Sequence, residues 1–281
     1  MAGTKPGELL LFWDYDTQWG CDRSRTGKAS KWGHLEFEYT EYLLDVHAQF
    51  GVPSCFAVVG AAALEGDRPY HDPTQIRRIH EAGHEVASHS FRHEWLPGLD
   101  RPGLKETLQK SKDALEQCIG APVGTFVPPF NQPFDYPAGF SFSLSERREA
   151  AVDRSDLRML CESLGEIGYR FCRVAYRPMS TRLAEWVFDR RIDRPSKLET
   201  IAGVTCVRLN TPGGFGRGAL DMLDRCANSG GLVVVYGHPH SVGGAGPQGK
   251  ASLVPFLKRA AELQREGAIR ICRPRELDPA A

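Results

Sequence analysis

Eight short apolar runs alternate with longer amphipathic segments, and this alternation limits the possible folds more than any other feature of the chain. The runs that predict strands are 9–13, 54–59, 84–88, 123–127, 168–172, 204–209, 232–236 and 268–272. The segments that predict helices are 38–50, 73–82, 103–119, 155–167, 216–228 and 251–266. Strands that are apolar throughout are typical of a parallel sheet covered on both faces. The pattern predicts an α/β fold, a distorted (β/α)7-8 barrel, with a doubly wound open sheet as the alternative.

The length and the patterning indicate one domain. A chain of 281 residues can form one barrel-sized domain or two ordinary ones. The Pro-rich stretch 128–140 and the Gly-rich stretch 242–249 indicate loops after strands rather than linkers. We therefore expect residues 1–281 to form a single domain. The stretch 173–203 is long, charged and poorly patterned, which indicates an insertion or a lid.

The composition excludes several classes of protein. Lys plus Arg equals 35 and Asp plus Glu equals 35, a balance that argues against a nucleic-acid partner. The apolar run 9–13 is too short for a signal peptide, and we expect no membrane span. The eight cysteines lack paired motifs, which indicates buried, reduced thiols. These features predict a cytoplasmic protein, and the oligomeric state is left open.

Chemically capable side chains follow four of the expected strands, at the point where each strand ends. They are Asp14 and Asp16, His89 and His93, Asn131, and His238 and His240. Because the carboxyl ends of parallel strands share one face, where the active sites of such folds are built, we expect these side chains to meet in one site.

The spacing of these residues favours a metal site. Asp14 and Asp16 lie two residues apart, and two like charges that close are costly unless a cation or a proton separates them. His89 and His93 lie four residues apart, a spacing that places two imidazoles side by side on a helical turn. An Asp-His-His set leaves room for water, as a catalytic divalent metal requires. His238 is expected to donate a proton to a leaving amine, with His240 as the alternative.

The order of these motifs resembles the polysaccharide deacetylase family, the family 4 carbohydrate esterases with a nodulation-type deacetylase domain. The most specific match is the stretch 83–93, Gly-His-Glu-Val-Ala-Ser-His-Ser-Phe-Arg-His. The resemblance extends from about residue 9 to residue 276, nearly the whole chain. It implies a distorted (β/α) barrel, a divalent metal that is usually zinc, and hydrolysis of an N-acetyl group on a sugar.

The resemblance also implies roles for single residues. It makes Asp14 the general base and His238 the general acid. It makes Asp16, His89 and His93 the metal ligands, and it gives the backbone amide of Phe130 a part in binding the oxyanion. The two aspartates are usually adjacent in the family, whereas Tyr15 separates them here, as in a variant Asp-x-Asp subgroup.

Two further positions depart from the family pattern. The third motif usually begins with an Arg that braces the base, and this position is Val127 here. Arg173 and Arg208, at the ends of the fifth and sixth expected strands, are candidates to replace it. Asp189 and Asp193 are candidates for the Asp of the fourth motif.

A substrate surface is expected around these groups. Trp19 and Trp95 follow the aspartates and His93, so that either indole could form a platform for a sugar ring or pack a loop. Asn131 could bind a hydroxyl group, and we include His240 and Phe130 among the substrate contacts.

These features predict a metal-dependent hydrolase that removes an N-acetyl group from an amino sugar, such as a cytosolic precursor or a glycoconjugate intermediate. One alternative is a catalytically impaired binding protein with the same fold. Another is a hydrolase of a different C–N amide, such as a formyl group. A haloacid-dehalogenase-type phosphatase also opens with Asp-x-Asp, but it needs a Thr where Gln18 stands, and it leaves the histidines unused.

Overall fold

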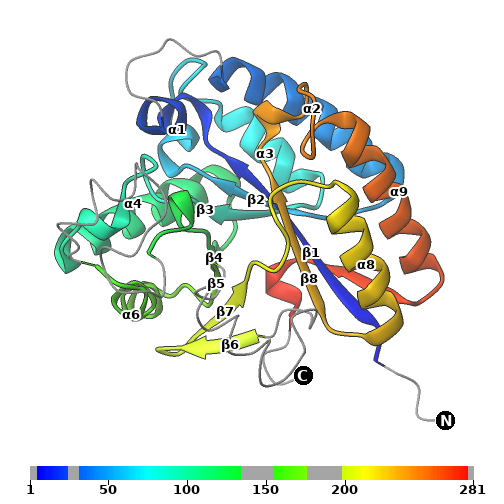
Figure 1. The fold of residues 1–281 in the computed structure, drawn as a ribbon. Helices are drawn as coiled ribbons and strands as arrows, with labels where there is room; N and C mark the ends of the chain where they lie inside the picture. The colour runs from blue at the N-terminus through cyan, green and yellow to red at the C-terminus, as the bar shows by residue number, and fades with distance from the viewer. Residues whose placement is uncertain (1–4, 25–31, 134–154, 176–197, 278–281) are drawn as a thin grey trace.

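The computed structural model describes residues 5–24, 32–133, 155–175 and 198–277. A strongly bent sheet lies at its centre, with helices around it (Figure 1). The strands are β1 (Gly7–Tyr15), β2 (Cys55–Val58), β3 (Glu85–Ser88), β4 (Thr125–Phe126), β5 (Phe171–Val174), β6 (Leu198–Ile201), β7 (Val204–Arg208), β8 (Leu232–Gly237) and β9 (Ile269–Cys272).

The sheet is a curled half-barrel in the order β6-β7-β5-β4-β3-β2-β1-β8. All its pairings are parallel except that of β6 with β7. The long strand β1 pairs with β8 along one edge, and its other edge pairs first with β9 and then with β2. The predicted distorted (β/α) barrel is therefore confirmed.

Side chains of the segment that follows β7 reach the free edge of β8, one of the two end strands of the curl. Asn210 follows β7; its Nδ2 donates a hydrogen bond to the Leu232 carbonyl at 2.7 Å, and its Oδ1 accepts one from the Val234 N–H at 2.9 Å. The Thr211 hydroxyl donates to the Val234 carbonyl at 2.5 Å. These bonds satisfy backbone groups of β8 that would otherwise lack a partner strand.

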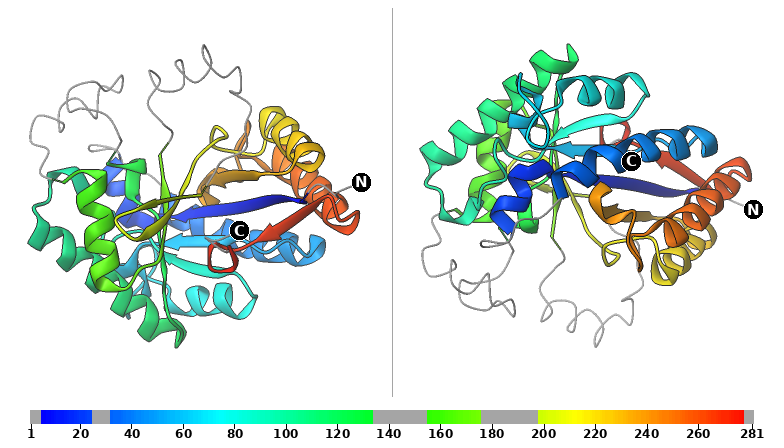
Figure 2. Two further views of the ribbon diagram at one scale, coloured as in Figure 1. Left: turned by 90° about the horizontal axis from the view of Figure 1, so that it is seen from below. Right: turned by 90° about the horizontal axis from the view of Figure 1, so that it is seen from above.

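The described residues form seven helices. They lie around the sheet, as the views from below and from above show (Figure 2). They are α1 (Thr17–Ser24), α2 (Trp32–Phe50), α3 (Pro73–Glu81), α4 (Arg101–Ile119), α6 (Leu157–Ile167), α8 (Arg217–Ser229) and α9 (Lys250–Arg265). Asp72, Asp100 and Asp156 cap the N-termini of α3, α4 and α6 through their side chains.

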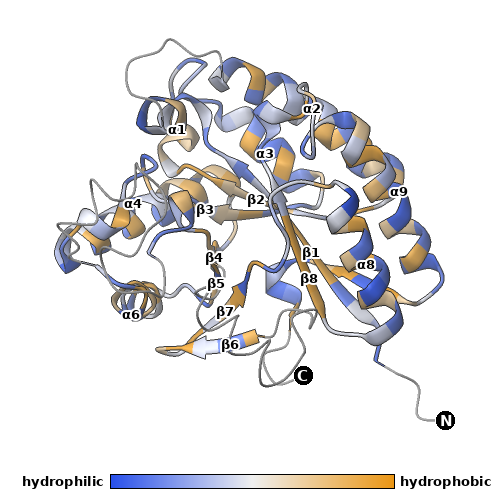
Figure 3. Cartoon of the chain, in the orientation of Figure 1, coloured by the Kyte–Doolittle hydropathy of each residue, from blue (hydrophilic) through white to orange (hydrophobic). Residues whose placement is uncertain are grey.

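Two apolar cores stabilise this arrangement. The larger one fills the space between the sheet and the helices, whose apolar faces turn towards the strands (Figure 3). The smaller one fills the interior of the curl and includes Leu10, Phe12, Phe171 and Val234. Side chains alternate between the two faces of a strand, so the residue two positions after Phe12, Asp14, also faces the interior. The strands thus carry polar groups into the mouth of the barrel.

Some expectations are corrected at this level. The eight expected strands are present, but the short antiparallel strand β6 was not expected. Helix α1 was also missed, and α2 begins at Trp32 rather than at residue 38. Within the stretch 173–203, the ends belong to β5 and β6, and residues 176–197 lie outside the described residues together with the expected insertion or lid.

Two further properties concern the whole described chain. None of its helices is both long and apolar enough to span a bilayer. All eight cysteines are unpaired, and all but Cys118 are buried.

Candidate active site

A buried ion pair joins the end of β1 to β5 across the interior of the barrel. The Arg173 guanidinium donates two parallel hydrogen bonds to the Asp14 carboxylate, at 2.7 Å each. Its plane lies over the rings of Phe12 and Tyr236, at 5.2 and 4.7 Å from their centroids. Asn131 accepts a further hydrogen bond from Arg173 at 3.2 Å. A bidentate pair enclosed in this way fixes the carboxylate in one orientation.

Of the two candidates for an Arg that braces the base, Arg173 is the one that contacts Asp14. The other candidate, Arg208, instead pairs with Glu199. Burial acts to raise the pKa of Asp14, but the charges of Arg173, His89 and His238 outweigh it, so this pKa lies below its usual value of 3.8. Asp14 is therefore an ionised carboxylate with a fixed direction.

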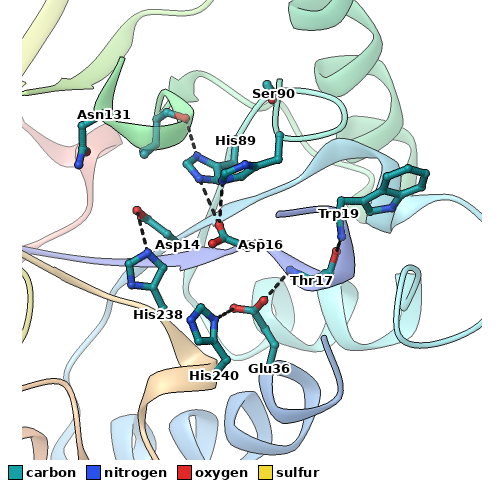
Figure 4. A network of polar contacts seen from close by, with 12 residues as sticks. Asp14, Asp16, Thr17, Trp19, Glu36, His89, Ser90, Asn131, His238 and His240 are labelled. Carbon is teal, nitrogen blue, oxygen red and sulfur yellow. Dashed lines mark hydrogen bonds and ion pairs between the residues drawn. The ribbon is translucent and has the colours of Figure 1, made fainter. Parts of the chain in front are cut away.

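Asp16 meets His89 and His93 just beyond the end of β1, as predicted (Figure 4). The Asp16 Oδ1 atom lies 3.3 Å from Nε2 of His89 and 3.5 Å from Nε2 of His93. One ligand atom from each residue lies within 4.8 Å of the other two, and all three side chains are buried. The His89 Nδ1 faces the Val127 carbonyl at 2.7 Å, which fixes the tautomer and turns the Nε2 lone pair towards Asp16. This arrangement is open to a cation.

The backbone around this triad is unusual. Residues 89–93 form an irregular turn, so the expected helical turn is wrong, although the two imidazoles still meet. Left-handed backbone, with φ between 53° and 62°, occurs at Thr17, Ser90, His93, Phe130 and Asn131. Such conformations cost of order 1–3 kcal/mol each and cluster at functional sites. Tight turns with left-handed residues, rather than a helix, therefore orient the imidazoles of His89 and His93.

His238 and His240 lie at the same mouth but in different environments. The His238 Nε2 lies 4.0 Å from Asp14 Oδ2. His240 instead faces Glu36, with its Nδ1 3.6 Å from Glu36 Oε1, and stacks on Trp32 at 4.3 Å between centroids. Of the two histidines, only His238 is placed beside the expected base.

Glu36 is a site residue that the sequence reasoning missed. Its carboxylate is fully buried and accepts a 2.5 Å hydrogen bond from the N–H of Thr17, the first residue of α1. Burial raises the pKa of Glu36 above its usual value. Glu36 thus holds the turn that presents Asp16. The available signal was an acidic residue on the same helical stripe as the buried Gly33, Phe37 and Thr40.

The expected substrate contacts fall into two groups. Trp95 and Phe130 pack beside His93, with the Phe130 ring 4.5 Å from the imidazole and 5.5 Å from the indole. Asn131 binds Arg173, which gives it a bracing contact inside the protein.

Trp19 is not part of this wall. Its indole points away from Asp16 and packs on Tyr70 and His71 (Figure 4). The observation therefore favours loop packing over a sugar platform for Trp19.

Acids and histidines that converge at the carboxyl ends of barrel strands give this protein the layout of a (β/α)-barrel enzyme. Residues 32–137 match the polysaccharide deacetylase family. A chitooligosaccharide deacetylase from Sinorhizobium fredii is 34% identical over 102 residues, which cover 34% of this chain and 44% of that protein. The uncharacterized protein YlxY from Bacillus subtilis is 30% identical over 98 residues, 35% of this chain and 28% of that protein. The chain thus spans less than half the length of these relatives.

The fold likeness covers nearly the whole chain. A Mycobacterium smegmatis protein assigned to the polysaccharide deacetylases has a TM-score of 0.59 at 19% identity, over 93% of this chain and 86% of that chain. A family 4 carbohydrate esterase from Streptomyces lividans, in complex with acetate, has a TM-score of 0.51 at 13% identity, over 99% and 96%. A family 4 pseudoenzyme from Bacillus anthracis has a TM-score of 0.52 at 15% identity, over 99% and 67%.

Residues 32–137 thus match the polysaccharide deacetylase family, and solved family 4 carbohydrate esterases share the fold of nearly the whole chain. The residues that match the family begin after Asp14 and Asp16. Membership of the variant Asp-x-Asp subgroup therefore stays a prediction.

Proposed function

We propose that this protein is a metal-dependent hydrolase that removes the N-acetyl group of an amino sugar. One observation carries the proposal: Asp16, His89 and His93 converge on a single point, while Asp14, two residues away, is held apart from them by Arg173. A cation-binding group and a separate, oriented carboxylate are the two parts that water-mediated amide hydrolysis needs. The related chitooligosaccharide deacetylase and the esterase that holds acetate support this choice of reaction.

The residues of the triad fit a divalent metal. Asp16 Oδ1 is buried and accepts no hydrogen bond from the described residues, although two imidazole nitrogens lie close to it. An unsatisfied buried carboxylate oxygen is costly, and a cation would satisfy it. One carboxylate and two imidazoles suit zinc, which would polarise the amide carbonyl and make a bound water more acidic.

Asp14 would act as the general base. Its lowered pKa keeps it ionised near neutral pH, and its oxygens retain lone pairs beyond those that Arg173 occupies. Arg173 prevents the carboxylate from rotating, so that Asp14 can take the proton of the attacking water in one fixed geometry.

His238 would act as the general acid. It lies beside Asp14 and exposes part of its ring, so it can reach a departing nitrogen. The Phe130 amide would stabilise the oxyanion, and Trp95 with Phe130 would form an apolar wall beside the acyl group.

The choice of substrate rests on the match to polysaccharide deacetylases and on the predicted cytoplasmic location. We propose an N-acetylated sugar or glycoconjugate, and a cytoplasmic location remains a prediction. A nucleotide- or lipid-linked intermediate under assembly would suit that location.

The test is the substitution Asp14→Asn, with Asp45→Asn on the exposed face of α2 as the matched control. Free amine and acetate released from a panel of N-acetyl sugars would be measured, together with bound zinc. Asp14→Asn is expected to keep its zinc and to lose turnover by about 100-fold or more, while Asp45→Asn behaves as wild type. If no N-acetyl sugar releases acetate from the zinc-loaded wild-type protein, the proposal is wrong.

Two alternatives lead to different outcomes of that experiment. A binding protein without activity was suggested by the absence of Arg at Val127, but Arg173 now supplies that brace to Asp14. A hydrolase of another C–N amide would not act best on the N-acetyl sugars. It would release formate or a larger acid from the same amino sugars when these carry a formyl or a larger acyl group.

A further inference from the structure

The side chain of Gln248 contacts both the backbone N–H and the imidazole ring of His238. The Gln248 Oε1 atom accepts a hydrogen bond from the backbone N–H of His238 at 2.8 Å. The same oxygen lies 3.1 Å from Nδ1 of the His238 ring. A backbone N–H can only donate, so the atom of the Gln248 amide that faces it must be the oxygen.

This assignment determines which ring nitrogen carries hydrogen. An amide oxygen only accepts, so the Nδ1 beside it must be the donor and carry a proton. Nε2 is then the nitrogen directed at the site, 4.0 Å from Asp14 Oδ2. In the doubly protonated ring, the proton that His238 delivers would therefore leave from Nε2, while Nδ1 keeps its hydrogen and its bond to Gln248.

Contacts with two other segments hold the loop that carries Gln248, although its residues 243–247 are exposed. The Phe215 N–H donates to the Pro247 carbonyl at 2.6 Å, and Gly214, with φ +103°, has no space for a side chain against Pro247. A Cβ at Gly243 would collide with Tyr39 of α2. These contacts fix the residue before Gln248 and the loop around it, so Gln248 is a rigid support for the ring.

We propose that Gln248 is a positioning residue that orients His238 and sets its tautomer for proton donation. The proposal rests on the proposed function, in which His238 is the general acid. Gln248 lies ten residues after His238, on the Gly-rich loop 242–249, and supplies an uncharged acceptor. Among the described residues, it is the side chain whose hydrogen bond holds His238 Nδ1.

The kinetic test compares two substitutions. Gln248→Leu keeps the approximate volume but removes the acceptor, and it is expected to lower kcat by about 10- to 100-fold, as loss of orientation does. KM should change by less than about twofold, because the Gln248 side chain acts on His238 and is given no substrate contact in the proposal. Gln248→Glu keeps an acceptor oxygen, so its kcat should stay within a few-fold of the wild-type value. Gln109→Leu, an exposed substitution on α4, is the control.

A substrate-free measurement separates this proposal from the proposed function. The ring nitrogens of His238 would be observed by ¹⁵N NMR at about pH 8.5, where an ordinary imidazole is neutral, and assigned by their absence in His238→Gln. The wild-type protein should show the Nδ1–H tautomer, and Gln248→Leu a mixture.

Each outcome decides one of the two proposals. An Nε2–H tautomer in the wild-type protein, or an unchanged kcat in Gln248→Leu, would overturn the role of Gln248. A wild-type protein with the Nδ1–H tautomer but no deacetylase activity would overturn the proposed function and leave the Gln248 contact intact.

Discussion

Two pairs of buried histidines have nearly the same ring geometry and very different surroundings. The rings of His89 and His93 lie 5.0 Å apart in an edge-on arrangement, and those of His47 and His84 lie 5.1 Å apart in the same arrangement. The first pair faces the Asp16 carboxylate. The second pair has neutral partners, so the environment of each ring, and not the ring spacing, separates a candidate metal site from a structural cluster.

Neutral groups bind both ring nitrogens of His47 and the Nδ1 of His84. His47 Nδ1 faces the Val52 carbonyl at 2.7 Å, and its Nε2 accepts a hydrogen bond from the Trp13 indole at 2.9 Å. His84 Nδ1 accepts a hydrogen bond from the Ser54 N–H at 3.2 Å. Burial lowers the pKa of His47 to about 3 and that of His84 to about 4. Both rings are therefore neutral parts of the core, with no role as ligands.

The largest expected effect would come from a substitution in the first pair. His89→Ala should reduce bound zinc from about one ion per chain to almost none and should abolish turnover, because the three-ligand set is broken. His84→Asn should leave zinc and turnover unchanged. Metal analysis of the purified variants and an acetate-release assay would measure both effects. Full zinc occupancy in His89→Ala would remove His89 from the ligand set.

The second largest effect would come from breaking the buried Asp14–Arg173 ion pair beside the first histidine pair. Arg173→Met leaves Asp14 buried without its partner, and it is expected to lower the free energy of unfolding by about 3–5 kcal/mol. The measurement is urea denaturation at neutral pH. Adding Asp14→Asn to Arg173→Met removes the uncompensated charge and should recover part of the loss. Equal stability of wild type and Arg173→Met would show that the pair does not support the fold.

The same two regions show how far the sequence could predict the structure. The end of an apolar run is a local signal, and it located Asp14, His89 and His238 correctly at the mouth of the barrel. The Arg173–Asp14 pair joins residues 159 positions apart, and two candidates for the brace stayed open because the curl of the sheet decides between them.

Glu36 and Gln248 were missed for a related reason. Each acts through a contact between separate elements, and a single acidic or amide residue in a helix or loop gives no pattern that would reveal such a contact. Helix α1 was missed because its eight residues are too few and too polar to show an amphipathic period. Local pattern thus predicted the strands and the reactive groups, while the supporting side chains depend on the folded geometry.

The smallest effect concerns the pH dependence of stability and comes from the second pair. The pKa of His84 is lower in the folded protein, about 4, than its ordinary value of 6.5. Between these values the unfolded chain binds more protons than the folded one, so the free energy of unfolding rises with pH across this window. The stabilisation is complete above about pH 6.5 and is lost as the pH falls towards 4, with a slope of at most about 1.4 kcal/mol per pH unit.

His84→Asn keeps an acceptor for the Ser54 N–H but cannot titrate, so it isolates this term. The variant should show a shallower decline in the free energy of unfolding between pH 7 and pH 5 than wild type does, measured by urea denaturation at each pH. His34→Asn, a substitution on the exposed face of α2, is the matched control. An identical slope in His84→Asn and wild type would mean that His84 titrates in the folded core, and the two histidine pairs would then no longer differ in the way that their partners imply.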